Sequence, residues 1–251
     1  TSMNNYKDII EEKYRKILLI HGWGFTRQIW AKNLHGIREK NCISVNLYEC
    51  IKNSKGDLKE AARKIISEYG DFDLIISWSL GCFLAKELEL LMSMSLKKMV
   101  FISYNPKFLN DKSWLYGLEE TQVTKLKENL KINKELAIKN FYLLVLGDIE
   151  DKKKYYKVIS KNTKEVLNIE TSCLILGLEV LEKYKYKNFE NNSNIKKIYI
   201  FGEKDLISSK EIAYFIKSNE PDSLVKIIKG SSHIPFVTNA SQFNEILKGF
   251  L

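Results

Sequence analysis

The most constraining feature of the sequence is the segment 72–86, in which an apolar run passes without a gap into a helical pattern. Residues 74–76 are aliphatic and predict a strand buried on both faces. Apolar residues then recur at helical spacing in Phe83, Leu84, Leu88, Leu91 and Met92. A strand that turns directly into a helix places its junction residue on a sharp, strained bend, and that residue is Ser79.

The neighbours of Ser79 are small, as such a bend requires. Ser77 and Gly81 lie two positions on either side, so the segment reads as G-x-S-x-G with its first glycine replaced by serine. A serine at position 77 is acceptable if its φ stays negative. These five residues alone leave two interpretations open, a nucleophilic serine or a surface serine that begins a helix.

Length and composition indicate an ordinary globular protein. The chain of 251 residues fits one domain with a substantial core, or such a core with an inserted segment. Hydrophobic residues make up 45% and charged residues 28%. No apolar run approaches the roughly 18 residues of a membrane span, and no signal-peptide pattern occurs. We therefore expect a cytoplasmic protein with no membrane partner.

The cysteines do not form a recognisable site. Cys42, Cys50, Cys82 and Cys173 are scattered, with no C-x-x-C and no histidine at ligand spacing. This pattern indicates neither a zinc site nor a disulfide framework. We expect free thiols, no metal and no cofactor.

The net charge of +9 favours an acidic partner or a nucleic acid. Only four of the 40 basic residues are arginines, and isoleucine and asparagine are abundant. The same bias could arise from an AT-rich genome, so charge alone selects no partner.

Strand and helix patterns alternate along most of the chain, which predicts a parallel α/β sheet. Strands are expected at 15–20, 42–47, 74–76, 97–103, 195–201 and 224–228. Helices are expected at 27–38, 57–69 with Asp57 as N-cap, 83–92, 208–218 and 239–251. The alternation stops between about 110 and 190, where every pattern is helical. We therefore expect a core formed by 3–109 and 191–251, with 110–190 inserted as a helical lid.

Two further polar residues follow predicted strands. Asp205 follows the fifth strand and His233 the sixth, and parallel strands bring their carboxyl ends to one edge of the sheet. A serine hydroxyl becomes a good nucleophile when an imidazole takes its proton and a carboxylate orients that imidazole. Of the three histidines, His21 ends the first strand and His35 lies in a predicted helix. His233 is therefore the expected base for Ser79.

Alternatives remain for the base and the acid. His233 could be a loop residue that caps the last helix. Asp205 could be a turn residue, with Glu203 and Asp222 as rival acids. We favour Asp205 because it follows its strand at the distance that a loop acid requires. No acid follows the fourth strand in residues 103–106.

The oxyanion of a tetrahedral intermediate needs two preorganised backbone donors. One is expected from Leu80, directly after the nucleophile, and the other from Trp23 in the glycine-containing loop after the first strand. Trp23 and Trp78 could instead be plain core aromatics. We expect His21 to be structural.

With these residues assembled, the chain resembles the pimeloyl-acyl-carrier-protein methyl ester esterases of biotin synthesis, an α/β-hydrolase family. The order Ser79, Asp205, His233 is the α/β-hydrolase order. The matching segments are 21–24 (His-Gly-Trp-Gly), Trp30, 78–81 (Trp-Ser-Leu-Gly), Asp205, 233–236 (His-Ile-Pro-Phe), 140–141 (Asn-Phe) and 177–181 (Gly-Leu-Glu-Val-Leu).

The resemblance implies an α/β-hydrolase fold with a helical lid over an apolar channel that binds a dicarboxylate chain. Phe141 aligns with a channel-lining position, and Trp23 would also contact the substrate. The implied partner is an acidic acyl carrier protein that docks on a basic lid, with no nucleic acid and a monomeric enzyme. Residues 121–169 contain 11 lysines and 6 acidic residues, which suits such a partner. A solvated, lysine-rich helix face explains the same count.

The expected function is a serine esterase that cleaves the methyl ester of pimeloyl-acyl carrier protein. Ser77 at the first glycine of the elbow and lysines where the family has lid arginines leave room for other biotin-pathway esterases. The alternatives are a broad carboxylesterase or thioesterase for short acyl chains and a non-catalytic binding protein with a hydrolase fold.

Overall fold

The computed structural model describes residues 14–34, 41–92, 94–185 and 194–251, and its centre is a parallel six-stranded sheet. The strand order is β2-β1-β3-β4-β5-β6, and every neighbouring pair is parallel. The strands are β1 (Ile17–Ile20), β2 (Cys42–Val45), β3 (Leu74–Trp78), β4 (Lys98–Ile102), β5 (Lys196–Gly202) and β6 (Leu224–Ile228). The sheet class predicted from the alternating pattern is confirmed.

Burial follows strand position. All five residues of β3 are buried, as expected for a central strand covered on both faces, whereas in β6 at the sheet edge only Ile228 is buried. In register, Ser77 of β3 lies opposite Ile20 of β1 and Phe101 of β4. The carboxyl ends of the central strands therefore meet at one edge, which brings the loops that follow them together.

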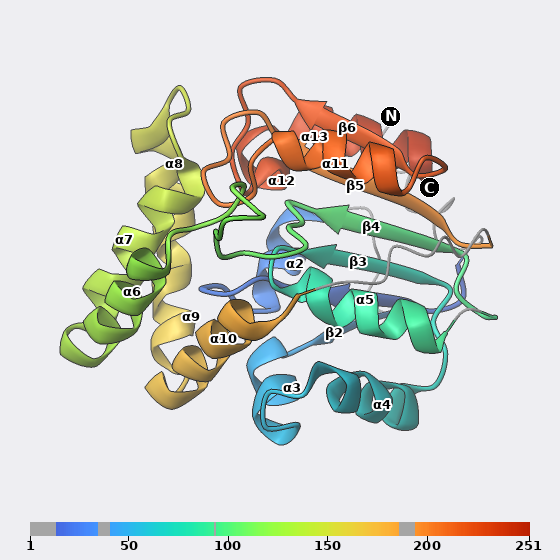
Figure 1. Ribbon diagram of the computed structural model, residues 1–251, viewed down its shortest axis with the longest axis horizontal. Coiled ribbons are helices and arrows are strands. Elements are labelled where there is room, and N and C mark those ends of the chain that lie inside the picture. The colour runs from blue at the N-terminus through green and yellow to red at the C-terminus, as the bar shows by residue number, and fades with distance from the viewer. Residues whose placement is uncertain (1–13, 35–40, 93, 186–193) are drawn as a thin grey trace.

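Helices cover both faces of the sheet. In Figure 1, α5 lies in front of the sheet and α2 behind it. Trp30, Phe236 and Phe243 pack together and join three of the helices, α2, α12 and α13. The helices outside the β4–β5 connection are α2 (Gln28–Asn33), α3 (Leu47–Asn53), α4 (Leu58–Tyr69), α5 (Gly81–Leu91), α11 (Glu211–Asn219), α12 (Pro235–Thr238) and α13 (Ala240–Phe250).

The connection from β4 to β5 contains turns and isolated bridges up to residue 119, and helices account for most of its described residues after that. It contains α6 (Glu120–Ile132), α7 (Lys134–Leu146), α8 (Lys152–Ile159), the 3₁₀ turn η1 (Ser160–Asn162), α9 (Thr163–Leu167) and α10 (Thr171–Lys183). Figure 1 shows these helices grouped beside the carboxyl ends of β3 and β4. The segment begins near an isolated bridge between Leu109 and Leu118. The expected boundaries at 3 and at 190–191 lie outside the described residues, so the division into core and lid stays a prediction.

One predicted strand end was wrong, two short helices were not expected, and one predicted helix cap was confirmed. The strand expected at 42–47 ends at Val45, and helix α3 follows at once because Asn46 accepts hydrogen bonds from the N–H groups of Tyr48 and Glu49. The short helix α12 was not expected. Asp57 caps α4 as predicted, through the N–H groups of Lys59 and Glu60. The last residues of the helix expected at 27–38, including His35, fall in the undescribed segment 35–40.

A neutral ionic cluster lies inside the fold. The side chain of Lys86 is fully buried, and its Nζ lies 3.2 Å from Glu89 Oε2 and 3.2 Å from Glu220 Oε1. Lys197 Nζ lies 2.7 Å from Glu89 Oε1 and 3.1 Å from Glu220 Oε2. Tyr199 donates to Glu220 at 2.7 Å. The cluster joins α5, β5 and the end of α11 without leaving an unpaired charge.

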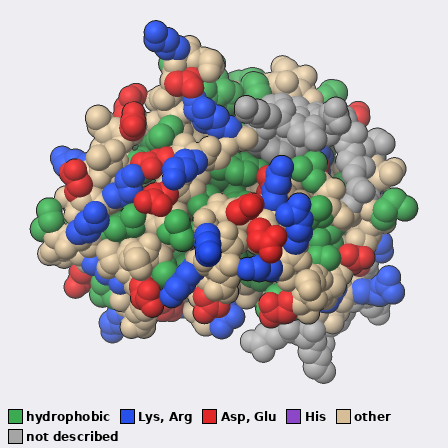
Figure 2. Space-filling model, turned by 60° about the horizontal axis from the view of Figure 1, so that its bottom comes forward, with side chains coloured by type: hydrophobic (Ala, Val, Ile, Leu, Met, Phe, Trp, Pro, Cys, Tyr) green, Lys and Arg blue, Asp and Glu red, His purple; other side chains and the backbone are tan. Residues whose placement is uncertain are grey.

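Figure 2 shows one face of the molecule, on which Lys and Arg side chains are interspersed with Asp and Glu side chains. This face therefore presents no field of a single sign. Within the residues that the structure describes, none of the helices combines the length and the apolar composition of a membrane span. The same residues contain no group of three His, Cys, Asp or Glu side chains placed to hold a metal ion.

Candidate active site

Ser79 lies on the turn between β3 and α5 in a left-handed conformation, with φ at 53°. Such a conformation is strained for a residue other than glycine, and the surroundings hold it in place. The Ser79 N–H donates to the Ile102 carbonyl at 2.9 Å. Gly81 makes the turn possible, because a Cβ there would lie 2.5 Å from the His21 carbonyl oxygen and 2.7 Å from that of Ile20. Ser77 stays within β3 and donates to the Val100 carbonyl at 3.1 Å.

His233 joins Ser79 to Asp205. Its Nε2 lies 2.7 Å from Ser79 Oγ, and its Nδ1 lies 2.7 Å from Asp205 Oδ2. All three side chains are buried, with relative exposures of 8% for Ser79, 1% for His233 and 6% for Asp205. Burial removes competing water and strengthens these hydrogen bonds. The structure thus brings together the serine, aspartate and histidine that were expected from the sequence to act together.

Asp205 is held by its own loop. Its Oδ1 accepts from the N–H groups of Ile207 at 2.7 Å and Ser208 at 2.9 Å, which leaves Oδ2 directed at His233. The acid that the structure joins to His233 is Asp205, in preference to the two rivals considered from the sequence. Glu203 accepts from the Gly230 N–H at 2.7 Å, and Asp222 lies exposed on the surface.

The backbone of His233 makes three hydrogen bonds with other segments of the chain. Its carbonyl oxygen accepts from Trp78 Nε1 at 2.8 Å and from Ser103 Oγ at 2.8 Å. Its N–H donates to the Val145 carbonyl of α7 at 3.1 Å. Ser103, which follows β4 with φ at 51°, also accepts from Ser208 Oγ at 2.7 Å through its carbonyl oxygen. Sequence reasoning missed Val145 because a backbone carbonyl leaves no signature in residue type, and it missed Ser103 because the partner of its hydroxyl is defined only by the tertiary fold.

Two backbone N–H groups belong to residues beside Ser79, because Leu80 follows it in the chain and Trp23 lines the same cavity. Within the described part of the chain, neither N–H has a hydrogen-bond partner. The loop that carries Trp23 packs on the elbow, since a Cβ at Gly22 would lie 3.2 Å from Ser79 Cβ. Two free donors near a buried hydroxyl are the arrangement that an oxyanion requires. The side chain of Trp23 is buried in the core, and the residue also lines the cavity beside Ser79.

His21 is a structural residue. Its Nδ1 donates to the Gly22 carbonyl at 2.8 Å, and its Nε2 accepts from the Leu47 N–H at 3.0 Å. One donor and one acceptor are what a neutral imidazole offers. Burial lowers the pKa of His21 from 6.5 to about 4, so the ring is neutral at pH 7.

A small apolar cavity opens onto Ser79. Its volume is about 30 Å³, which is room for one or two water molecules. The lining residues are Trp23, Ser79, Leu118, Gln122, Val123, Leu126, Phe141, Leu144, Leu178, Leu181 and Ile207. Phe141 stands edge-on to Trp23, with ring centroids 4.8 Å apart. Helices α6, α7 and α10 thus supply most of the apolar wall.

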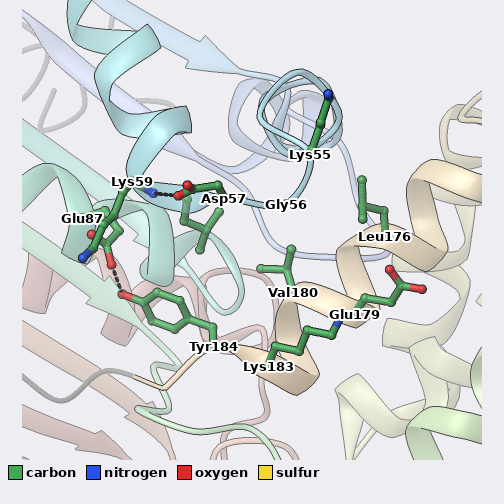
Figure 3. A pocket seen from close by; sticks show the side chains of 11 residues that line it. Lys55, Gly56, Asp57, Lys59, Glu87, Leu176, Glu179, Val180, Lys183 and Tyr184 are labelled. Atoms are coloured by element: carbon green, nitrogen blue, oxygen red, sulfur yellow. Dashed lines mark hydrogen bonds between the residues drawn. The ribbon is translucent and has the colours of Figure 1, made fainter.

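A larger pocket of about 380 Å³ lies on the other face of α10 (Figure 3). Its lining includes none of Ser79, Asp205 and His233 and none of the residues that line the small cavity. Its ionisable lining balances three lysines, Lys55, Lys59 and Lys183, against three acids, Asp57, Glu87 and Glu179. Asp57 caps α4 and Glu87 accepts from Tyr184 at 2.8 Å, so two of these acids are already engaged. We therefore assign the chemistry to the small cavity.

A parallel sheet in which a serine on a strand–helix turn meets an aspartate and a histidine from later strand ends defines the α/β-hydrolase fold. Solved structures agree. An esterase from Exiguobacterium antarcticum superposes with a TM-score of 0.76 at 15% identity, covering 94% of this chain and 91% of that chain. A hydrolase from Oleispira antarctica gives a TM-score of 0.76 at 16% identity, covering 94% and 90%. The expected fold class is confirmed.

The names of the sequence relatives are more specific about activity than those of the solved structures. The chain is 23% identical over 236 residues to the pimeloyl-[acyl-carrier protein] methyl ester esterase of Legionella pneumophila strain Corby, with 94% of each chain covered. It is 24% identical over 238 residues to the protein of the same name from Nitrosospira multiformis, with 90% of each covered. No family model matches the chain. The resemblance predicted from the motifs is confirmed at the level of overall similarity.

Proposed function

We propose that this protein is a serine hydrolase of carboxylic esters in which Ser79 is the nucleophile, His233 the base and Asp205 the orienting acid. The observation that carries the proposal is the pair of 2.7 Å contacts that joins His233 to both partners. Names of relatives and structural neighbours support ester hydrolysis as the reaction. The geometry is that of a nucleophile activated by an oriented imidazole.

The reaction follows from the roles of these groups. Ser79 Oγ attacks the ester carbonyl carbon while His233 Nε2 takes the hydroxyl proton, and the resulting oxyanion accepts from the N–H groups of Trp23 and Leu80. Collapse of the intermediate breaks the C–O bond, and His233 returns the proton to the leaving alcohol. Water then attacks the acyl-enzyme with His233 again as base, which releases the acid and restores Ser79.

The proposed substrate is the methyl ester of pimeloyl-acyl carrier protein, so that methanol leaves first. Support comes from the names of the relatives. The cavity beside Ser79 is walled by aliphatic and aromatic side chains, as a polymethylene chain would require, and Phe141 is its proposed channel-lining residue. Segment 110–190 is the proposed lid over this channel.

An acidic carrier would meet lysines on the proposed lid. Lys127 pairs with Glu182 at 2.7 Å and Lys139 with Glu135 at 2.5 Å, so these two are engaged. Helix α8 contributes Lys153 and Lys157, both exposed to solvent. We therefore place the carrier contact at α8, because these charges are free to act on a partner.

The test of the mechanism is Ser79→Ala, with Ser67→Ala as the matched control on an exposed face of α4. We expect Ser79→Ala to lose on the order of 10⁴-fold or more in kcat/KM and to resist labelling by a fluorophosphonate. Ser67→Ala should keep both properties. Full esterase activity in Ser79→Ala would falsify the mechanism.

The test of the substrate compares methyl pimeloyl ester on the carrier protein with the same ester free in solution. We expect a lower KM for the carrier-bound ester. Lys153→Glu/Lys157→Glu should raise only that KM, whereas Lys217→Glu/Lys229→Glu, exposed on the sheet domain, should not. Equal KM values for the two esters would remove the carrier from the proposal.

A second candidate is a carboxylesterase or thioesterase for short acyl chains. The cavity volume of about 30 Å³ favours it, because a short acyl group needs the smaller expansion. Under this alternative, p-nitrophenyl acetate would be hydrolysed at least as efficiently as the carrier-bound ester. The wild-type protein would also fail to restore biotin synthesis in a bacterium that lacks the esterase.

A further inference from the structure

Position 177 on α10 faces both residues that would bind the oxyanion. A Cβ at Gly177 would lie 2.9 Å from Trp23 Cδ1 and 3.2 Å from Trp23 Nε1. The same Cβ would lie 3.9 Å from Leu80 Cδ2. Gly177 therefore lies between the side chains of the two proposed donors.

The backbone of α10 gives no reason for a glycine here. Gly177 is in the middle of the helix, without a left-handed φ. A glycine inside a helix destabilises it by about 1 kcal/mol relative to alanine. The glycine instead allows α10 to approach Trp23 closely. A Cβ at this position would lie less than 3.0 Å from the indole, so either the helix or the ring would have to move.

Trp23 has little freedom to shift away. Its Nε1 donates to the Leu174 carbonyl of the same helix at 2.8 Å. The Phe141 ring of α7 stands against it with an interplanar angle of 89°. The residue is 3% exposed, so its indole is enclosed. A methyl group at 177 would thus push on the indole of Trp23, the residue whose backbone N–H is the proposed oxyanion donor.

We propose that Gly177 is a positioning residue, whose missing side chain lets α10 hold Trp23, and through it the oxyanion donor, in place beside Ser79. This inference rests on the proposed ester hydrolysis and adds a residue that touches no reacting atom. A displacement of about 1 Å at such a donor costs up to about 100-fold in rate.

The experiment is Gly177→Ala, assayed with p-nitrophenyl butyrate, which needs no carrier. We expect kcat to fall by about 10- to 100-fold while KM changes by less than about threefold, because the donor acts on the transition state. The melting temperature should fall by a few degrees, because the clash with the enclosed indole outweighs the helix preference of alanine. Gly249→Ala in α13 is the matched control, since a Cβ there meets nothing within 4 Å. It should raise the melting temperature and leave kcat unchanged.

A double-mutant cycle separates positioning from folding. In a Trp23→Ala background the clashing indole is gone, so adding Gly177→Ala should change kcat by less than about twofold. Wild-type kcat in Gly177→Ala, or an equal penalty in both backgrounds, would overturn the inference. A wild-type protein that neither hydrolyses the ester nor reacts with a fluorophosphonate would instead refute the proposed function.

Discussion

The backbone N–H of His233 donates a hydrogen bond to the carbonyl oxygen of Val145 at 3.1 Å. Val145 lies in the last turn of α7, where carbonyl groups have no partner within the helix. The end of α7 therefore supplies a hydrogen-bond acceptor to the loop that carries the proposed base. Gly147, directly after α7, packs against the loop of Asp205, so one helix end contacts both loops.

The first prediction concerns Gly147, which has φ at 61° and whose Cβ would lie 2.5 Å from the Lys204 carbonyl oxygen. Gly147→Ala should lower the free energy of unfolding by about 3 kcal/mol, because it combines a strained φ with a backbone clash. Gly230→Ala has the same strain, with φ at 69°, but nothing lies within 4 Å of its Cβ. That control should cost about 1 kcal/mol in urea unfolding. Equal losses would show that the Lys204 contact is unimportant.

The second prediction is that Asp205→Asn lowers kcat by about 10⁴-fold without unfolding the protein. The N–H groups of Ile207 and Ser208 would keep the amide oxygen in the place of Oδ1. The amide NH₂ would then face His233 Nδ1 and force the proton onto Nε2, so the ring could not accept from Ser79. Glu203→Gln is the control and should retain activity within a few-fold. A large loss in Glu203→Gln instead would make that residue the acid.

The third prediction concerns the buried ionic cluster. Burial alone would raise the pKa of Glu220, but Lys86 and Lys197 outweigh it and lower that pKa. Lys86→Met leaves a buried carboxylate uncompensated and should cost about 3–5 kcal/mol in urea unfolding at pH 7. Lys97→Met removes an exposed lysine 3.9 Å from Asp73 and should cost less than about 1 kcal/mol. Similar costs for the two variants would contradict the assigned role of Lys86.

The fourth prediction is a pH dependence that originates from His21. Its pKa is about 4 in the folded chain against 6.5 for an ordinary histidine, so the unfolded chain binds the extra proton between these values. Wild-type stability should therefore fall by about 3 kcal/mol from this group as pH drops from 6.5 to 4. In His21→Gln that contribution disappears, so its deficit at pH 7 should shrink at pH 4.5. Parallel pH profiles for the two proteins would refute the assignment.

The sequence predicted those parts of the fold that are encoded locally. The β3–α5 unit was predicted because an apolar run and a helical repeat meet at Ser79, and Asp205 and His233 because they directly follow strand patterns. Helix α3 was not predicted, because Leu47 extends the apolar pattern of β2 and the helix starts from a side-chain cap by Asn46. Local pattern alone does not choose between these two continuations.

The supporting contacts of the site could not be predicted in this way. Val145 and Leu174 act through carbonyl oxygens, which every residue type possesses. Gly177 acts through the absence of a side chain, and its role depends on a residue more than 150 positions away in the chain. Ser103 has a hydroxyl group, but its partners His233 and Ser208 are defined only by the tertiary fold.

The small size of the cavity beside Ser79 has a consequence for inhibition. A space of about 30 Å³ is smaller than an ester, so we expect reagents to reach the serine from a more open arrangement of α6, α7 and α10. The free energy of that opening then lowers the measured affinity of every ligand. A ligand that stabilises the open arrangement binds more tightly. Inactivation rates should level off with reagent concentration at the opening rate, whatever the intrinsic reactivity of the reagent.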